Sequence, residues 1–103
     1  MIKLSVLYPV ADNAKLDMDY YCKSHMPMVK QKLVAACKGI AVEQGLAGGA
    51  PGAAPTYIAM GHVYFDSVAE FQTAFEPHAA EIMADIPNYT SIQPVIQISE
   101  VKM

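Results

Sequence analysis

The sequence predicts an α+β fold in which a four-stranded antiparallel sheet has two helices packed on one of its faces. Three observations support this prediction. Strand-like and helix-like stretches follow one another in the order β-α-β-β-α-β. Each helical stretch joins two strands, as in βαβ units with right-handed crossovers. The chain has 103 residues, a length typical of one domain, so residues 1–103 are expected to share one core.

The N-terminal third of the chain is predicted to hold one strand and one helix. Residues 2–8 alternate between apolar and other side chains, a period-two pattern that a proline ends. Across residues 18–38, apolar side chains recur at steps of three and four, as in an amphipathic helix, with Asp17 or Asp19 as its cap. Pro27 lies inside this helix and lacks a backbone donor, so we expect a kink or a break just before it.

The middle of the chain is predicted to form two antiparallel strands and a long connection. Alternation predicts strands over residues 40–46 and 57–65. Residues 47–55 between them are rich in glycine, alanine and proline, which favour turns. Because neither half of the chain holds enough apolar residues for its own core, this stretch is a loop within one domain.

The C-terminal third is predicted to hold the second helix and the last strand. Ser67 and Glu70 fit a capping box, which starts a helix over residues 68–86. Pro77 interrupts that helix. Residues 92–101 alternate again and form the last predicted strand.

This order of elements is that of a ferredoxin-like fold, which leaves one face of the sheet, here called the open face, without helices. The residues predicted to lie on the open face are apolar, and they are Ile2, Leu4, Val6, Ile58 and Met60. Exposed strands of that character would aggregate. We therefore expect the open face to pack against the same face of a second copy, which gives a two-fold homodimer.

Composition and charge exclude several classes of partner. The formal net charge is −3 and the seven basic residues are scattered, so we expect no nucleic-acid binding. No apolar run approaches the roughly 18 residues of a membrane span, so we expect no membrane insertion. No signal peptide is recognisable at the start. The protein is therefore expected to be cytoplasmic, with Cys22 and Cys37 reduced.

His25 is the first candidate for catalysis. It lies on the apolar stripe of the first helix beside Tyr21, and a buried imidazole needs a hydrogen-bond partner or a ligand. It is either a core histidine bound to a backbone carbonyl or a general acid or base, because imidazole titrates near neutral pH. Pro27, two residues later, favours an open space beside the ring.

The other two histidines lie on different elements. His78 follows Pro77 and is predicted on the inward face of the second helix or at its border. It is either a second catalytic residue or a boundary residue in polar contact with Glu81 or with the loop after the helix. His62 alternates with Met60 on the third strand, which places it on the open face, in the core of the dimer.

A pocket for a small organic ligand, between sheet and helices, is predicted from small residues on the strands. If Leu4 faces the second copy, then its neighbour Ser5 faces the helices, together with Ala59 and Gly61. Small side chains below a kinked helix leave volume unfilled, although tight packing of helix on sheet also uses small residues. The opposite assignment of faces would exchange these lists. The predicted ligand-binding residues are Ser5, Tyr21, Tyr57, Ala59, Gly61 and Tyr89.

Neither a metal site nor a cofactor is predicted. His-x-x-x-His and Cys-x-x-Cys pairs are absent, and the carboxylates near the histidines are predicted on outward faces. The glycine-rich loop joins two strands and does not open a helix, as a phosphate-binding loop must. A redox reaction would therefore need an electron source from outside the chain.

Several segments of the sequence resemble the EthD family. They are residues 20–29 (YYCKSHMPMV), 45–52 (GLAGGAPG), 77–82 (PHAAEI), 86–90 (IPNYT) and 92–101 (IQPVIQISEV). The resemblance implies the dimeric α+β-barrel superfamily, several members of which act on small organic molecules without a metal or an organic cofactor. Members of the family are often labelled reductases or oxidoreductases, and the family is named for a component of ethyl tert-butyl ether degradation. The resemblance therefore implies these labels for this chain, but it does not identify the reaction.

The residues and the resemblance together lead to two hypotheses. The first is a cofactor-independent enzyme, with oxidoreductase-like or isomerase- or cyclase-like chemistry on a small, apolar, oxygenated compound. His25 would be its acid or base, with His78 and a tyrosine orienting the substrate. The second is a non-catalytic binding or accessory protein in a degradation pathway. Turnover distinguishes the two hypotheses, whereas a bound ligand does not.

Overall fold

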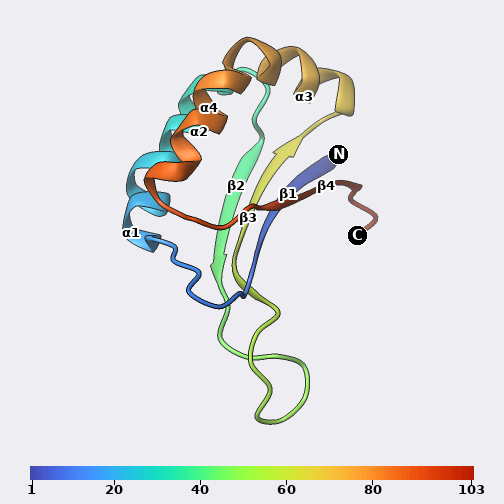
Figure 1. The fold of residues 1–103 in the computed structure, drawn as a ribbon. Coiled ribbons are helices and arrows are strands. Elements are labelled where there is room, and N and C mark those ends of the chain that lie inside the picture. Colours follow the sequence, from blue (N-terminus) through green and yellow to red (C-terminus); the bar gives the residue numbers. More distant parts are fainter.

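The computed structural model describes residues 1–103 and confirms the α+β, ferredoxin-like architecture (Figure 1). A four-stranded antiparallel sheet has the strand order β2-β3-β1-β4, and the helices lie on one of its faces. The last strand begins three residues later than predicted, because Pro94 has no backbone N–H for the ladder. The strands are β1 (Ile2–Pro9), β2 (Gly39–Gln44), β3 (Tyr57–Phe65) and β4 (Val95–Glu100).

The first helix breaks where the proline predicted. It consists of α1 (Met18–Tyr20), a π-helical turn η1 (Tyr21–His25) and α2 (Met26–Lys32), and it ends earlier than expected. Asp17 caps α1, because its carboxylate accepts a hydrogen bond from the backbone N–H of Tyr20 at 3.1 Å. Pro27 has no N–H to continue the regular ladder, and the N–H of Met26 donates to the carbonyl of Tyr21, five residues back.

The second helix is also divided at its proline. It consists of α3 (Val68–Phe75), a 3₁₀ turn η2 (Glu76–His78), α4 (Ala79–Asp85) and a second 3₁₀ turn η3 (Ile86–Asn88). The Oγ atom of Ser67 accepts from the backbone N–H of Glu70 at 3.1 Å, which confirms the predicted cap. Pro77 lies in η2, and α3 and α4 run in different directions on either side of this turn (Figure 1).

The strand register corrects the predicted faces of β1. Leu4 lies opposite Val63 and Ser5 lies opposite His62, and residues directly opposed in neighbouring strands share a face. Val63 lines the space below the helices, so Ser5 lies on the open face and not below the helices as predicted. The residues of β1 that were predicted on the open face lie instead on the helix side, and they are Ile2, Leu4 and Val6.

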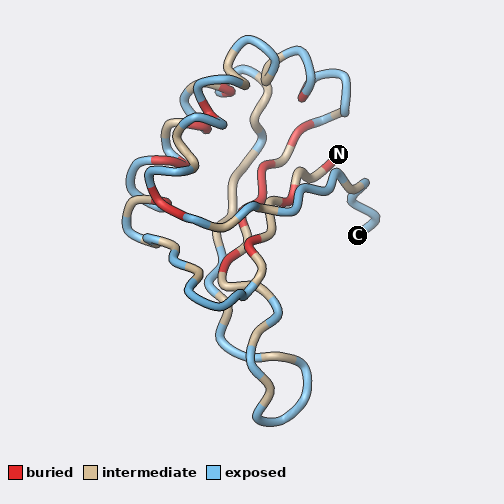
Figure 2. The backbone as a smooth tube through the Cα atoms, in the orientation of Figure 1, coloured by how far each residue is buried: buried red, intermediate tan, exposed pale blue.

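The faces of β3 agree with the prediction. Gly61 and Val63 face the helices, while Met60 and His62 face away from them. Buried segments are concentrated between the sheet and the helices (Figure 2). The largest fully buried side chains are Tyr8, Tyr21, Leu33 and Phe65.

Two further observations concern the helices and the thiols. None of the helices is both long and apolar enough to cross a membrane. Cys22 and Cys37 are free thiols, and the first of them is exposed.

Candidate functional site

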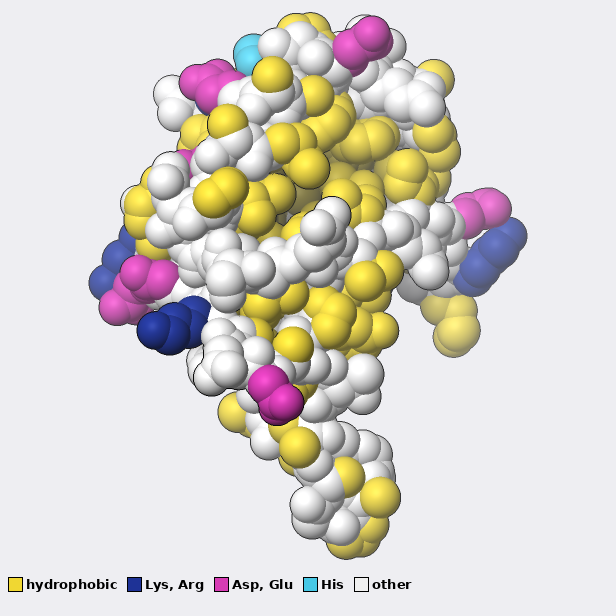
Figure 3. Space-filling model, viewed as in Figure 1, with side chains coloured by type: hydrophobic (Ala, Val, Ile, Leu, Met, Phe, Trp, Pro, Cys, Tyr) yellow, Lys and Arg dark blue, Asp and Glu magenta, His cyan; other side chains and the backbone are white.

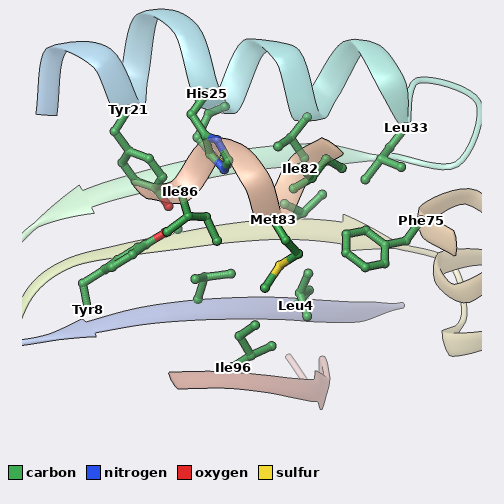
Figure 4. Close-up of a pocket in the computed structure, with 15 residues that line it drawn as sticks. Leu4, Tyr8, Tyr21, His25, Leu33, Phe75, Ile82, Met83, Ile86 and Ile96 are labelled. Atoms are coloured by element: carbon green, nitrogen blue, oxygen red, sulfur yellow. The ribbon is translucent and has the colours of Figure 1, made fainter. Parts of the chain in front are cut away.

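An apolar cleft lies between the helices and strands β1, β3 and β4. Figure 3 shows apolar side chains gathered in a hollow beside α4. The cleft has a volume of about 60 Å³. Met83 and Ile96 line it and are partly exposed, so they mark its mouth. No charged side chain lines the cleft, and its polar side chains are His25, Tyr8 and Tyr21 (Figure 4).

The π-helical turn positions His25 in this cleft. Its wide turn directs Tyr21 and His25 to the same side, with their rings stacked at a centroid distance of 5.7 Å. The imidazole is 5% exposed, and Tyr89 lies against it at 4.7 Å between ring centroids. Two aromatic rings therefore hold the imidazole, and Figure 4 shows it pointing from the helix into the cleft.

Asp85, at the end of α4, is the hydrogen-bond partner of His25. Its Oδ2 atom lies 2.9 Å from Nδ1 of His25. Its Oδ1 atom accepts from the hydroxyl of Tyr20 at 2.7 Å and from the amide of Asn88 at 3.0 Å. Burial raises the pKa of Asp85, but the hydrogen bonds from Tyr20, Asn88 and His25 outweigh it, so the pKa lies below its ordinary value.

The ionised carboxylate fixes the tautomer of the histidine. A carboxylate only accepts hydrogen bonds, so Nδ1 of His25 carries the proton that points to Asp85. In the neutral ring, Nε2 is then an acceptor with a free lone pair. The pair is therefore arranged so that His25 can accept a proton from a molecule in the cleft.

Three tyrosines pack together beside His25, and two of them, Tyr8 and Tyr21, line the cleft. The hydroxyls of Tyr8 and Tyr89 are 2.6 Å apart, and the ring of Tyr21 packs edge-on against Tyr8 with 5.5 Å between the ring centroids. Burial is the main cause that raises the pKa of all three above its ordinary value. They consequently keep their protons at neutral pH and can act as hydrogen-bond donors. Tyr21 reaches this position because Gly61 below it has no side chain, and a Cβ there would overlap the hydroxyl.

The structure brings together only part of the predicted site. His25, Tyr21 and Gly61 line the cleft, and Tyr89 packs against His25 from behind. Ser5 lies on the open face, which contradicts its predicted place in the floor of the pocket. The other predicted residues do not line the cleft: Ala59 is fully buried, whereas Tyr57 and His78 are half-buried.

Two residues of the site were missed from the sequence. Tyr8 was not considered for the site, and its alternation with Val6 in the observed register places it on the helix side. Asp85 was not considered, because the carboxylates were expected to face outward. That expectation is wrong for Asp85, which contacts His25. Asp85 follows the buried Ile82 by about one helical turn, so both side chains lie on the same face of the helix. This spacing is the sequence feature that could have predicted an inward-facing Asp85.

Groups that could bind a metal ion are few. No set of three His, Cys, Asp or Glu side chains lies close enough together to hold one. Each of the two histidine–carboxylate pairs provides only two potential ligands.

Comparison with known proteins places this geometry in a family. The model described as the EthD domain matches residues 15–93. An EthD-like protein from Ralstonia eutropha JMP134, known from its crystal structure, is 51% identical, with a TM-score of 0.94 over 99% of this chain and 92% of that chain. No curated protein matches the sequence.

Two more distant crystal structures share the fold. An ethyl tert-butyl ether d (EthD) family protein from Bacillus halodurans C-125 is 19% identical, with a TM-score of 0.74 over 98% of both chains. A dimeric protein of unknown function with a ferredoxin-like fold, from Bacteroides fragilis NCTC 9343, is 14% identical, with a TM-score of 0.60 over 97% of this chain and 95% of that chain.

Proposed function

The chain belongs to the EthD family, and from this premise we propose that it acts on a small, mainly apolar organic molecule with one oxygen function, with His25 as the general acid or base. The observation that supports this most is the buried His25–Asp85 pair, whose Nδ1–Oδ2 contact is 2.9 Å long, at the wall of an uncharged cleft. A histidine held in one tautomer beside an apolar cleft is suited to proton transfer.

The surroundings of His25 support a neutral substrate. The lining includes no charged side chain, and burying an unpaired charge there would cost several kcal/mol or more. A carbonyl or hydroxyl oxygen of the substrate would accept from the hydroxyl of Tyr21 and, with Tyr89 donating to Tyr8, from the hydroxyl of Tyr8. The rest of the molecule would lie against the aliphatic side chains and expel water.

The proposed step is transfer of one proton. A C–H bond next to the carbonyl breaks, the proton goes to Nε2 of His25, and the electron pair moves onto the carbonyl oxygen as an enolate. The tyrosine hydroxyls would stabilise that negative oxygen. Asp85 would stabilise the imidazolium that forms, because its carboxylate stays ionised beside Nδ1. Return of the proton to a different atom would make the step an isomerisation.

The small volume of the cleft favours a small substrate, or a larger one that displaces side chains at the opening of the cleft. About 60 Å³ is far less than the roughly 300–1,000 Å³ of a typical drug-sized pocket. Met83, on α4, is the exposed side chain that a larger ligand would displace.

Deuterium exchange tests the proton transfer without a known final product. A panel of small cyclic and aromatic ketones in D₂O is followed by proton NMR, with wild-type protein and with His25→Ala. We expect the wild type to accelerate exchange next to the carbonyl, and His25→Ala to lose about 10²–10⁴-fold of that rate. Gln72→Ala, on the exposed surface of α3, is the control and should keep the wild-type rate.

The outcomes separate the two hypotheses. Full activity in His25→Ala would contradict the role given to this residue. Ketones that bind, by line broadening in the same spectra, but do not exchange would support instead a binding or accessory protein that uses the same cleft.

We also infer that the protein is a homodimer whose two copies meet through their open faces. Support comes from the absence of helices on that face and from the related fold described as dimeric in Bacteroides fragilis. The apolar residues Leu7, Met60 and Val95 lie on it, although β1 contributes fewer apolar side chains to it than predicted.

A further inference from the structure

Tyr20 is bound to the same carboxylate that holds His25. Its hydroxyl donates to Oδ1 of Asp85 at 2.7 Å, while Oδ2 of that carboxylate lies 2.9 Å from Nδ1 of His25. The side-chain amide of Asn88 also donates to Oδ1, at 3.0 Å. The two oxygens of one carboxylate thus have separate partners, and the donors on Oδ1 fix the rotation that turns Oδ2 toward the imidazole.

The π-helical turn brings Tyr20 and His25 to this one carboxylate. Tyr20 ends α1 and His25 ends η1, five positions later. In a regular α-helix, side chains five positions apart point about 140° away from each other around the axis. The hydrogen bonds of a π-helix span five residues instead of four, so side chains five positions apart return to nearly the same side. The wide turn therefore allows both residues to contact Asp85 on α4.

The ring and the backbone of Tyr20 are also held in place. The ring stacks on that of Tyr89, with 6.1 Å between the centroids, and the backbone N–H donates to the carboxylate of Asp17. The hydrogen bond to Asp85 raises the pKa of Tyr20 above its ordinary value, so the hydroxyl keeps its proton and is the donor. Tyr20 lines a separate groove that shares no residue with the cleft, so it acts on His25 only through the carboxylate.

Asp85 is the one charged side chain in contact with the imidazole. The titratable groups around the ring come from β1, η1, α4 and the segment after η3, and they are Tyr8, Tyr21, Asp85 and Tyr89. The three tyrosines are neutral because burial raises their pKa values. Glu81, one turn before Asp85, is paired with Lys32 at 2.6 Å. The proton affinity of His25 therefore depends mainly on the negative charge that Asp85 directs to Nδ1.

We propose that Tyr20 is a positioning residue for the proton transfer: it occupies Oδ1 of Asp85, turns Oδ2 to His25 and limits the pull of the carboxylate on the imidazole proton. The inference rests on the function proposed above. A hydrogen bond from a neutral donor draws negative charge toward Oδ1, so the imidazolium gains less from Asp85 than from a carboxylate without that donor. His25 then stays a free base over a wider pH range, as a proton acceptor in the cleft requires.

Tyr20→Phe tests the proposal, because it removes one hydroxyl and keeps the ring that stacks on Tyr89. The titration of His25 is followed by NMR of its ring in the free protein between pH 5 and pH 9. We expect the proton-binding constant of His25 to rise about twofold to tenfold, since one hydrogen bond to Asp85 is lost. In the deuterium-exchange assay, the acid limb of the pH–rate profile should move to higher pH by the same factor, while the alkaline plateau stays within about threefold.

Asn88→Ala is an independent variant if Tyr20→Phe does not fold. It removes the other donor to Oδ1, so it should move the titration of His25 in the same direction but by a smaller factor, because its contact is longer. Tyr64→Phe, on the open face, is the matched control and should leave the titration and the pH–rate profile unchanged.

Two results overturn the role of Tyr20. One is a titration of His25 that stays unchanged in Tyr20→Phe or moves to lower pH. The other is a loss of exchange rate at every pH with an unmoved acid limb, as a merely structural contact would give. The titration needs no ketone, so it separates the two proposals: a shift to higher pH in a protein that exchanges no ketone would overturn the proposed function and support the action of Tyr20 on the pair.

Discussion

Two histidine–carboxylate pairs lie on opposite faces of the same sheet and differ in what surrounds the second ring nitrogen. His25 contacts Asp85 at 2.9 Å and His62 contacts Glu43 at 3.0 Å, and both rings are buried. Beyond Asp85, the ring of His25 faces the apolar cleft. Both nitrogens of His62 are already paired, because Ser5 occupies the second. The first ring has hydrogen-bonding capacity left for a ligand, whereas the second joins three strands.

The carboxylates of the two pairs differ as well. The side chain of Asp85 is 17% exposed and accepts hydrogen bonds from three donors. Glu43 is half exposed and only His62 donates to it. The two contacts are similar in length, but their carboxylates differ in role: Asp85, with three donors, holds its histidine in one tautomer, whereas the half-exposed Glu43 adds a charge to a surface.

The largest difference is expected when each carboxylate is neutralised. Asp85→Asn no longer fixes the tautomer of His25, so the ketone exchange rate should fall by at least about tenfold and by as much as about 10⁴-fold. Glu43→Gln should keep the rate within about threefold, because it lies on the other face of the sheet. NMR in D₂O measures both. Equal losses in the two variants would mean that the cleft does not contain the reacting histidine.

The tyrosine packing of the cleft is tested at two glycines of the sheet. A Cβ at Gly61 would overlap the hydroxyl of Tyr21, so Gly61→Ala should lower the free energy of unfolding by about 1–3 kcal/mol. Gly39→Ala is the matched control, because its Cβ would meet only Tyr64 at an ordinary 3.7 Å, and its effect should stay below about 1 kcal/mol. Urea denaturation measures both, and equal effects would contradict the close approach of Tyr21.

The smallest expected effect is the pH dependence of the Asp85 contribution to stability. The folded pKa of Asp85 is lowered, so its contribution is fully present above the unfolded pKa of about 4 and disappears as the pH falls through the folded value. Wild type should be more stable than Asp85→Asn at pH 7, and the difference should shrink as the pH falls below about 4. Asp12→Asn, in an exposed turn, should change stability by less than about 0.5 kcal/mol throughout.

Much of the fold followed from local patterns in the sequence. The strands over 40–46 and 57–65, the Ser67 cap and the breaks at Pro27 and Pro77 lie close to their observed places. These features depend on backbone dihedrals, side-chain periodicity and missing N–H groups, which act over a few residues. His25 was found for the same reason, because its stripe and the nearby proline are neighbours in sequence.

The sequence by itself determined the order of the elements, their breaks and the family. Only the tertiary structure decided which face of β1 lies below the helices, and with it the places of Ser5 and Tyr8. Alternation along a strand separates its residues into two faces but does not tell which face the helices cover. The register with the neighbouring strands decides which residues lie below the helices. The pairing of His25 with Asp85, 60 residues apart, likewise depends on how the second helix packs across the first.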